Sequence, residues 1–393
     1  MSCPGIFIIR EWALTAVIII SKLLHVFDRD GDIKILKDHR CVIMTRRRAM
    51  KVFGAGVAFS APNTLAATLP KDMDRTIVLR DPGGVFRTAW QEAFYTPFEQ
   101  ETGIRIIPIT SAAEPTAQII MMVEGKNYLW DMAGALTEQA LNMLVRHDTI
   151  EPHGLLEDPA LSGIPKTFCT AHSIASDIYS TVMAVDKSAF PQGALPVTWG
   201  DFWDRHRFPQ WRSLRKDPSD TLEAALLADG VKPSELYPLD LNRAFASLEK
   251  IRPAIAAWWS SAAQARNLLE SGEVDMLTTW STRINLENRN LAVSWEQNMW
   301  GVDSWAILKG TPKADLCRIF LKYVCDPKRQ AVWTKWLRNG PPNAEAYRYI
   351  PAQTASILPT YPPHLEKGFH ADAQYWTDNR ETVLERFNEW LLQ

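Results

Sequence analysis

Residues 75–107 read RTIVLRDPGGVFRTAWQEAFYTPFEQETGIRII, and this stretch decides the fold class. Residues 75–80 have the composition of a short strand, and the turn at residues 81–84 ends it. Apolar residues then recur at helical spacing over residues 85–100, and residues 101–107 return to a strand pattern. A strand, a helix and a second strand in this order predict a parallel βαβ unit and an α/β fold.

The turn Asp81-Pro82-Gly83-Gly84 lies where the predicted helix begins. Backbone N–H groups at the N-terminus of a helix receive anions or the polar end of a ligand. Gly84 is therefore a candidate ligand-binding residue. The turn contains no G-x-G-x-x-G or P-loop pattern, which argues against a nucleotide site.

The alternation of strands and helices continues outward from this stretch. Two compact regions joined by long strands predict two lobes, with a ligand cleft between them at the ends of the strands. We expect strands at residues 128–133, 178–185 and 305–308, and helices at 138–146, 222–227, 241–251, 314–323 and 330–337.

The composition is that of a globular protein: 46% of the 393 residues are hydrophobic and 22% are charged. The formal net charge is −2, so the chain has no basic excess with which to neutralise phosphates, and we expect no nucleic-acid partner. The charge is unevenly distributed. Residues 1–67 carry 10 basic and 5 acidic side chains, which leaves the remainder of the chain with a net charge of −7.

The basic leader has the pattern of an export signal at residues 44–67. Arg46, Arg47 and Arg48 precede a short apolar run at residues 52–59, and small residues follow it. This order predicts a twin-arginine signal peptide and a periplasmic location. Residues 1–43 are then an upstream extension ahead of Met44. The alternatives are an N-terminal anchor in residues 1–43, or a basic amphipathic helix of the mature domain at the signal position.

The chain offers no pattern of a catalytic or metal centre. Its five cysteines form no C-x-x-C pair, and neither G-x-S-x-G nor H-E-x-x-H occurs. We therefore expect no cofactor, no metal and no enzymatic activity. A secreted hydrolase remains a remote alternative.

Several stretches together carry a resemblance to a known family. Residues 72–392 resemble the periplasmic solute-binding proteins of ATP-driven importers, in particular the spermidine/putrescine branch. The stretches that carry it include STVMAVD at 180–186, TWGDFWD at 198–204, DTLEAALLADG at 220–230, SGEVDM at 271–276, DSW at 303–305 and GPPN at 340–343.

The resemblance implies a two-lobe clamp that closes on a small ligand and delivers it to a membrane permease. Residues 72–180 and 306–393 would form the first lobe, and residues 187–300 the second. Residues 181–186 and 301–305 would be the crossing strands that act as a hinge. The implied ligand is a polyamine or a similar small organic cation, and the implied state is a monomer.

Asp303 is the first candidate for the site. The resemblance makes it a carboxylate that binds an amine, and its alternative role is to cap its own turn. Trp280 matches a tryptophan that stacks on the ligand in this family, where an aromatic face would attract an ammonium group.

Asp217 and Asp220 match an acidic pair of the polyamine binders, although Asp before a helix also serves as an N-cap. Trp258 and Trp259, together with Gln264, form a junction between aromatic and polar residues, and we expect at least one of the two tryptophans in the core.

Thr137 and Asn343 complete the expected polar lining. The polyamine binders have aromatic residues after the first strand, whereas this chain has the glycine turn at 81–84. That difference allows an anionic or zwitterionic end on the ligand, so an aminoalkylphosphonate or an opine-like compound is the alternative. Ferric iron is not expected, because the paired tyrosines that bind it in related proteins are missing from the sequence.

Overall fold

The computed structural model describes residues 75–111, 113–190, 194–286, 288 and 290–393, together with the backbone of four short strands before residue 45. The chain divides into two compact units, Met1–Leu69 and Pro70–Gln393. Apart from the four strands, the predicted extension 1–43 and signal segment 44–67 lie outside the described residues. The strands β1 (Ile19–Ile20), β2 (Leu23–Phe27), β3 (Ile33–Lys37) and β4 (Arg40–Met44) form one antiparallel sheet in this order.

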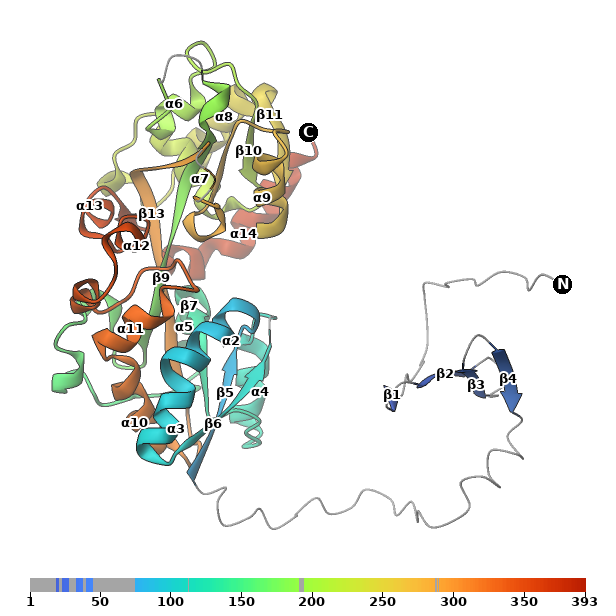
Figure 1. Cartoon of the computed structure of the whole chain (residues 1–393). Coiled ribbons are helices and arrows are strands. Elements are labelled where there is room, and N and C mark those ends of the chain that lie inside the picture. Colours follow the sequence, from blue (N-terminus) through green and yellow to red (C-terminus); the bar gives the residue numbers. More distant parts are fainter. Residues whose placement is uncertain are drawn as a thin grey trace. The chain divides into compact units, whose positions relative to one another are not determined.

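The second unit is built around a sheet with the strand order β11-β10-β12-β9-β13-β7-β5-β6. Its long strands β9 (Ile174–Asp186) and β13 (Leu291–Leu308) are antiparallel neighbours that run through both halves of the unit (Figure 1). The other strands are β5 (Thr76–Asp81), β6 (Arg105–Thr110), β7 (Met132–Thr137), β8 (Ile150–Glu151), β10 (Arg212–Arg215), β11 (Ile255–Trp259), β12 (Met276–Trp280) and β14 (Phe369–His370).

Helices cover the sheet, and no helix among the described residues is long and apolar enough to cross a membrane. They are α2 (Gly84–Trp90), α3 (Thr96–Thr102), α4 (Thr116–Glu124), α5 (Glu138–Arg146), α6 (Trp199–Trp203), α7 (Pro218–Ala228), α8 (Leu241–Ile251), α9 (Ala262–Glu270), α10 (Ala314–Val324), α11 (Pro327–Trp333), α12 (Ala352–Ala355), α13 (Pro362–Leu365) and α14 (Ala373–Leu391).

The βαβ unit predicted at residues 75–107 is present, with β5 and β6 parallel. The helical segment between them passes from α2 through a π-helical turn at Gln91–Tyr95 into α3. Pro97 lacks an N–H group and cannot donate to residue 93, which favours a local change of the hydrogen-bond pattern. The helix extends to Thr102, beyond the predicted boundary, and ends at Gly103 with φ 69°.

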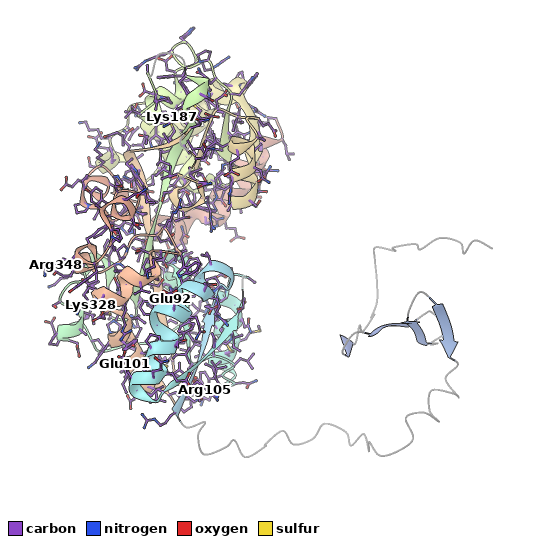
Figure 2. The ribbon with its side chains drawn as sticks, in the orientation of Figure 1. Glu92, Glu101, Arg105, Lys187, Lys328 and Arg348 are labelled. Carbon is purple, nitrogen blue, oxygen red and sulfur yellow. The ribbon has the colours of Figure 1, made fainter. Side chains whose placement is uncertain are left out.

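The unit has separate hydrophobic clusters at its two ends. We call the part that contains β5, β6 and β7 the first half, and the part that contains β10, β11 and β12 the second half. Trp90 and Trp305 are buried in the cluster of the first half, and Trp199 and Leu222 in that of the second. Charged side chains lie outside these clusters: Glu101 and Arg105 are on the first half and Lys187 is on the second (Figure 2).

The C-terminal helix departs from the predicted boundaries. Residues 306–393 were expected in the first lobe, but α14 packs into the hydrophobic cluster of the second half through Trp376, Phe387 and Trp390. The reason is its aromatic face, which meets Phe245 of α8 and Trp258 of β11. The helix α10, near the start of the range 306–393, packs into the hydrophobic cluster of the first half.

Candidate ligand-binding site

Two carboxylates lie opposite each other where the long strands cross the unit. Asp303 of β13 pairs in register with Asp177 of β9 and with Thr137 of β7. The Oδ1 atom of Asp303 is buried and has no hydrogen-bond partner among the described residues. Burial, followed by the charges of Asp177 and Glu138, raises the pKa of Asp303 well above its ordinary value. An ammonium group at this point would satisfy the unpartnered oxygen.

Asp177 is fully buried and hydrogen-bonded to neutral groups only. Asn339 donates to its Oδ1 atom, and Ser176 donates to its Oδ2 atom at 2.8 Å. Burial raises the pKa of Asp177 to about 6, although these two hydrogen bonds oppose the shift. The two aspartates therefore place more negative charge in a dry site than the neighbouring protein groups neutralise.

Glu138 and Arg80 flank the pair in the first half. The Oε2 atom of Glu138 accepts hydrogen bonds from the backbone N–H of Val302 at 3.1 Å and from Nε2 of His370 at 2.8 Å. Arg80 donates to the carbonyl oxygens of Gly134 and Ser111. Its Nε atom is buried without a partner among the described residues, and burial lowers the pKa of its guanidinium.

The second half contributes a cation that the sequence reasoning missed. Arg215, at the end of β10, donates to Asp220 at 3.2 Å and lies 3.8 Å from a carboxylate oxygen of Asp217. Its guanidinium lies 4.8 Å above the ring of Trp280, at the end of β12. A guanidinium held between carboxylates and an aromatic face keeps a fixed orientation, which suits it to bind a carboxylate.

Tyr179 lies between the two sets of charges. It is opposite Gly301 in the β9–β13 register, and a Cβ atom at position 301 would come within 2.4 Å of its hydroxyl oxygen. Burial raises the pKa of Tyr179 well above its ordinary value, and the charges of Asp303 and Asp220 act in the same direction. Arg215 lowers it. The pKa of this one phenol therefore depends on charged groups of both halves.

Asp217 and Asp220 are both engaged by protein groups. Asp217 is the N-cap of α7 and forms an ion pair with Arg380 at 2.7 Å, and these contacts lower its pKa despite burial. Asp220 accepts hydrogen bonds from Thr181 and Arg215, and burial raises its pKa.

The pair Trp258 and Trp259 belongs to the hydrophobic clusters. Trp258 lies against Trp390 of α14 with ring centroids 5.7 Å apart, and Trp259 is 1% exposed and donates its indole N–H to Thr278. Gln264 accepts a hydrogen bond from the backbone N–H of Ser260 at the start of α9. These contacts give all three candidates structural partners, and Trp259 also packs against Trp280 with ring centroids 5.4 Å apart.

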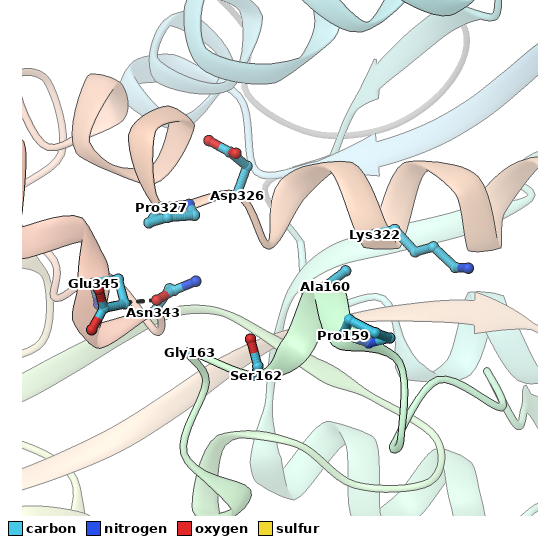
Figure 3. Close-up of a pocket in the computed structure, with 9 residues that line it drawn as sticks. All are labelled: Pro159, Ala160, Ser162, Gly163, Lys322, Asp326, Pro327, Asn343 and Glu345. Carbon is cyan, nitrogen blue, oxygen red and sulfur yellow. Dashed lines mark hydrogen bonds between the residues drawn. The ribbon is translucent and has the colours of Figure 1, made fainter.

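Gly84 and Asn343 lie apart from each other. Gly84 begins α2 with φ 57°, and a Cβ atom there would meet nothing within 4 Å, so position 84 borders open space. Asn343 is 3% exposed and its side chain donates to Cys325 and accepts from Glu345. It lines a cavity of about 530 Å³ beside Lys322 and Ser162, which none of the other candidates lines (Figure 3).

Four residues at the site carried weak signals in the sequence. Tyr179 lies in the predicted strand 178–185, whose apolar composition is typical of a buried strand, and Asp177 directly precedes that strand. Glu138 was predicted only as the start of a helix. Arg215 ends the short run Arg-Ser-Leu-Arg, which resembles a solvated edge. Among the described residues, no group of three or more His, Cys, Asp and Glu side chains is arranged to hold a metal ion.

Comparisons with known proteins agree with this architecture. Residues 93–360 match the family described as bacterial extracellular solute-binding protein. A gamma-aminobutyric acid-binding protein from Pseudomonas aeruginosa is 33% identical over 78% of this chain and 88% of its own length. A spermidine/putrescine-binding periplasmic protein from Haemophilus influenzae is 21% identical over 78% of this chain and 87% of its own length.

Solved structures give the same picture. An ABC transporter substrate-binding protein from Bradyrhizobium japonicum is 31% identical with a TM-score of 0.73, covering 80% of this chain and 99% of that one. The Atu4243 GABA receptor is 28% identical with a TM-score of 0.72, covering 80% and 97%. The PBP AgtB from A. tumefaciens R10, in complex with agropinic acid, is 28% identical with a TM-score of 0.64, covering 81% and 99%.

Proposed function

Because this chain belongs to the bacterial extracellular solute-binding proteins, the receptors of ABC transporters, we propose that it binds a small solute with an amino group and a carboxylate. Proteins of this family bind their ligands without a chemical step. The ligand class we assign is that of γ-aminobutyrate and related amine-bearing acids, including opines.

The observation that carries the proposal is the unpartnered Oδ1 atom of Asp303. Its neighbours Asp177 and Glu138 add negative charge, and the guanidinium of Arg80 already donates to backbone carbonyl groups. A buried carboxylate without a donor is costly, and a ligand ammonium group would supply both the donor and the opposite charge. Thr137, in register with Asp303, would line the same end of the cleft.

The carboxylate of the ligand would lie at Arg215. This guanidinium has a fixed orientation over Trp280 and retains donor atoms beyond the one that bonds to Asp220. Tyr179, which feels the charges of both Asp303 and Arg215, would lie along the middle of the ligand.

A polyamine is the second candidate, and the charges favour it less. A diamine needs a free carboxylate at each end. Asp217 pairs with Arg380, and Asp220 pairs with Arg215, so neither of these two predicted acids is free to bind a second ammonium group. The relatives agree: the γ-aminobutyrate-binding protein is 33% identical and the spermidine/putrescine-binding protein 21%.

The finer parts of the functional assignment follow from the sequence. We propose that the twin-arginine signal at residues 44–67 exports the protein to the periplasm, where it acts as a monomer and delivers its ligand to the membrane permease. N-terminal sequencing of the exported protein tests the signal. A mature chain that begins after residue 67 supports it, and retention of residues 1–43 contradicts it.

Thermal-shift screening of the mature protein tests the ligand class. The set should contain γ-aminobutyrate, 5-aminovalerate, aminoethylphosphonate, agropinic acid, putrescine and spermidine. A ligand at 100 times its Kd stabilises the folded protein by about 2.7 kcal/mol, which shifts the melting temperature measurably. We expect a shift with an amine-bearing acid. A shift with putrescine or spermidine alone would return the assignment to polyamines.

A further inference from the structure

The C-terminal helix α14 connects elements of both halves of the unit. Toward the first half, Asp378 forms an ion pair with Arg146 of α5 at 2.5 Å, and Thr377 accepts a hydrogen bond from Asn142 at 3.2 Å. Toward the second half, Arg380 reaches the start of α7. The first residue of α5 is Glu138, and the start of α7 carries Asp220, so α14 contacts the supports of both ends of the candidate site.

Arg380 makes three hydrogen bonds to the start of α7. Its Nη2 atom lies 2.7 Å from Oδ2 of Asp217, and its Nη1 atom lies 3.2 Å from Oδ1 of Asp217 and 3.0 Å from Oγ of Ser219. This bidentate geometry fixes a guanidinium and a carboxylate more rigidly than a single contact does. The hydrogen bond to Asp217 raises the pKa of Arg380, and burial opposes this shift.

The turn that Arg380 grips has an unusual backbone. Asp220 has φ 68° and ψ −34°, and residues that carry a Cβ atom rarely adopt a positive φ of this size. Such conformations persist where the surroundings determine them from several sides. Arg380 holds the turn on one side through Asp217 and Ser219, and Thr181 and Arg215 hold it on the other through the Asp220 carboxylate.

Arg380 also competes with Arg215 for the same carboxylate. Asp217 lies 2.7 Å from Arg380 but 3.8 Å from Arg215. Without Arg380, the largely buried Asp217 carboxylate would have Arg215 as its nearest cation among the described residues, and a buried charge strongly favours a close partner. Arg215 would then move toward Asp217 and leave its position 4.8 Å above the ring of Trp280.

We infer that Arg380 is a positioning residue, which holds Asp217 so that Arg215 stays directed at the carboxylate of the ligand. The inference deepens the proposed function and rests on it for the identity of the ligand. The positioning of Arg215 itself does not require a ligand, so it can be tested separately.

The first test compares two ligands by calorimetry, γ-aminobutyrate and n-butylamine, which lacks the carboxylate. We expect Arg380→Ala to lower the affinity for γ-aminobutyrate at least tenfold and the affinity for n-butylamine less than twofold. The matched control is Arg386→Ala on the same helix, where the side chain bonds to Asn242 and covers the ring of Phe245. We expect the control to change neither affinity. Equal losses for both ligands in Arg380→Ala would overturn the inference.

A rescue separates positioning from a merely structural role. Asn keeps the N-cap of α7 but removes the charge that would attract Arg215. We therefore expect the double variant Asp217→Asn/Arg380→Ala to regain most of the affinity for γ-aminobutyrate that Arg380→Ala loses. A double variant as weak as Arg380→Ala would contradict the competition between the two arginines.

Hydrogen exchange of the ligand-free protein provides the arm that does not depend on the ligand. We expect Arg380→Ala to accelerate exchange in peptides that cover residues 212–222, and Arg386→Ala to leave them unchanged. If the wild-type protein binds no amine-bearing acid, the proposed function fails, and this arm still decides the positioning. Unchanged exchange at residues 212–222 in Arg380→Ala would overturn it.

Discussion

Asp303 and Asp177 face each other across the β9–β13 ladder, and the Oδ1 atom of Asp303 has no donor among the described residues. Burial raises the pKa of both carboxyl groups. Two adjacent carboxylates in a dry site cannot both remain charged at low cost, so the pair takes up either a proton or an external cation. This relationship explains why an ammonium group is the part of the ligand that the first half would recognise.

The pair should make ligand binding depend on pH. Because burial raises the pKa of both carboxyl groups, the ligand-free pair holds a proton at a higher pH than an ordinary carboxylate does, and this proton competes with the ammonium group. We expect the affinity for γ-aminobutyrate to fall as pH decreases from 7.5 to 5, with release of a proton on binding. Calorimetry in buffers of different ionisation enthalpy measures both. Equal affinities at the two pH values would contradict this account.

Removing the charge of Asp303 should lower the affinity for the ligand and leave the fold intact. We expect Asp303→Asn to lower the affinity at least tenfold, about 1.4 kcal/mol, because the amide is neutral. The matched control is Asp315→Asn, since the Asp315 side chain is 96% exposed on α10. Titration calorimetry of the three proteins gives the comparison. An Asp303→Asn variant that binds as tightly as the control would remove Asp303 from the site.

Arg215 should determine the choice between acids and diamines. We expect Arg215→Gln to lower the affinity for γ-aminobutyrate at least tenfold and to raise the affinity for putrescine. The reason is that the variant frees the Asp220 carboxylate for a second ammonium group. Competition between the two ligands, followed by thermal shift, shows the reversal. A variant that loses affinity for both ligands equally would argue that Arg215 only supports the structure.

Substitution of Trp280 should affect ligand binding, whereas substitution of Trp258 should affect the stability of the fold. We expect Trp280→Ala to lower the affinity for the ligand at least tenfold, since Arg215 loses the ring on which it lies. Trp258 packs against Phe387 and Trp390, so Trp258→Ala should lower the free energy of unfolding by about 3–5 kcal/mol without changing the affinity. Denaturant unfolding and calorimetry test the two variants. The reverse assignment of effects would place Trp258 at the ligand.

Glu223 should make stability depend on pH. Its carboxylate is buried in α7 and accepts hydrogen bonds from Tyr237 and Trp376, and burial raises its pKa to about 7. The folded state therefore keeps a proton that the unfolded chain releases from about pH 4.5, so the free energy of unfolding falls as pH rises toward 7.

Glu223→Gln keeps an acceptor for both donors and cannot ionise. We expect the melting temperature of this variant, relative to the wild-type protein, to rise between pH 5 and pH 8. Scanning calorimetry at the two pH values gives the difference. A constant difference would show that Glu223 carries the same charge in the folded and unfolded states.

The periodic parts of the fold could be predicted from the sequence. The helices α5 and α8 begin and end at the predicted residues, because each has an N-cap and a clear apolar stripe. The strand β13 was expected at residues 305–308, with residues 301–305 as a crossing strand by resemblance, yet it spans the 18 residues Leu291–Leu308. Its first part, which pairs with the end of β9 in the second half, is mostly half-buried, so its pattern lacks the continuous apolar run of a core strand.

The site could be predicted only where one residue carried the signal. Asp303 and Trp280 stood out by type and by resemblance. Arg215 did not, because its role depends on Trp280 and Asp220, which meet it only in the folded structure. The same holds for Asp217, whose partner Arg380 lies on a helix far along the chain. Sequence spacing cannot show that an acid is already neutralised by a distant arginine.

The ratio of two dissociation constants distinguishes a receptor for amine-bearing acids from a receptor for diamines. Calorimetry of the mature wild-type protein at pH 7.5 should compare γ-aminobutyrate with putrescine, which has the same number of carbon atoms and an aminomethyl group in place of the carboxylate. We predict that γ-aminobutyrate binds at least tenfold more tightly, because Asp303 and Arg215 present opposite charges to the two ends of the ligand. Tighter binding of putrescine would contradict the account.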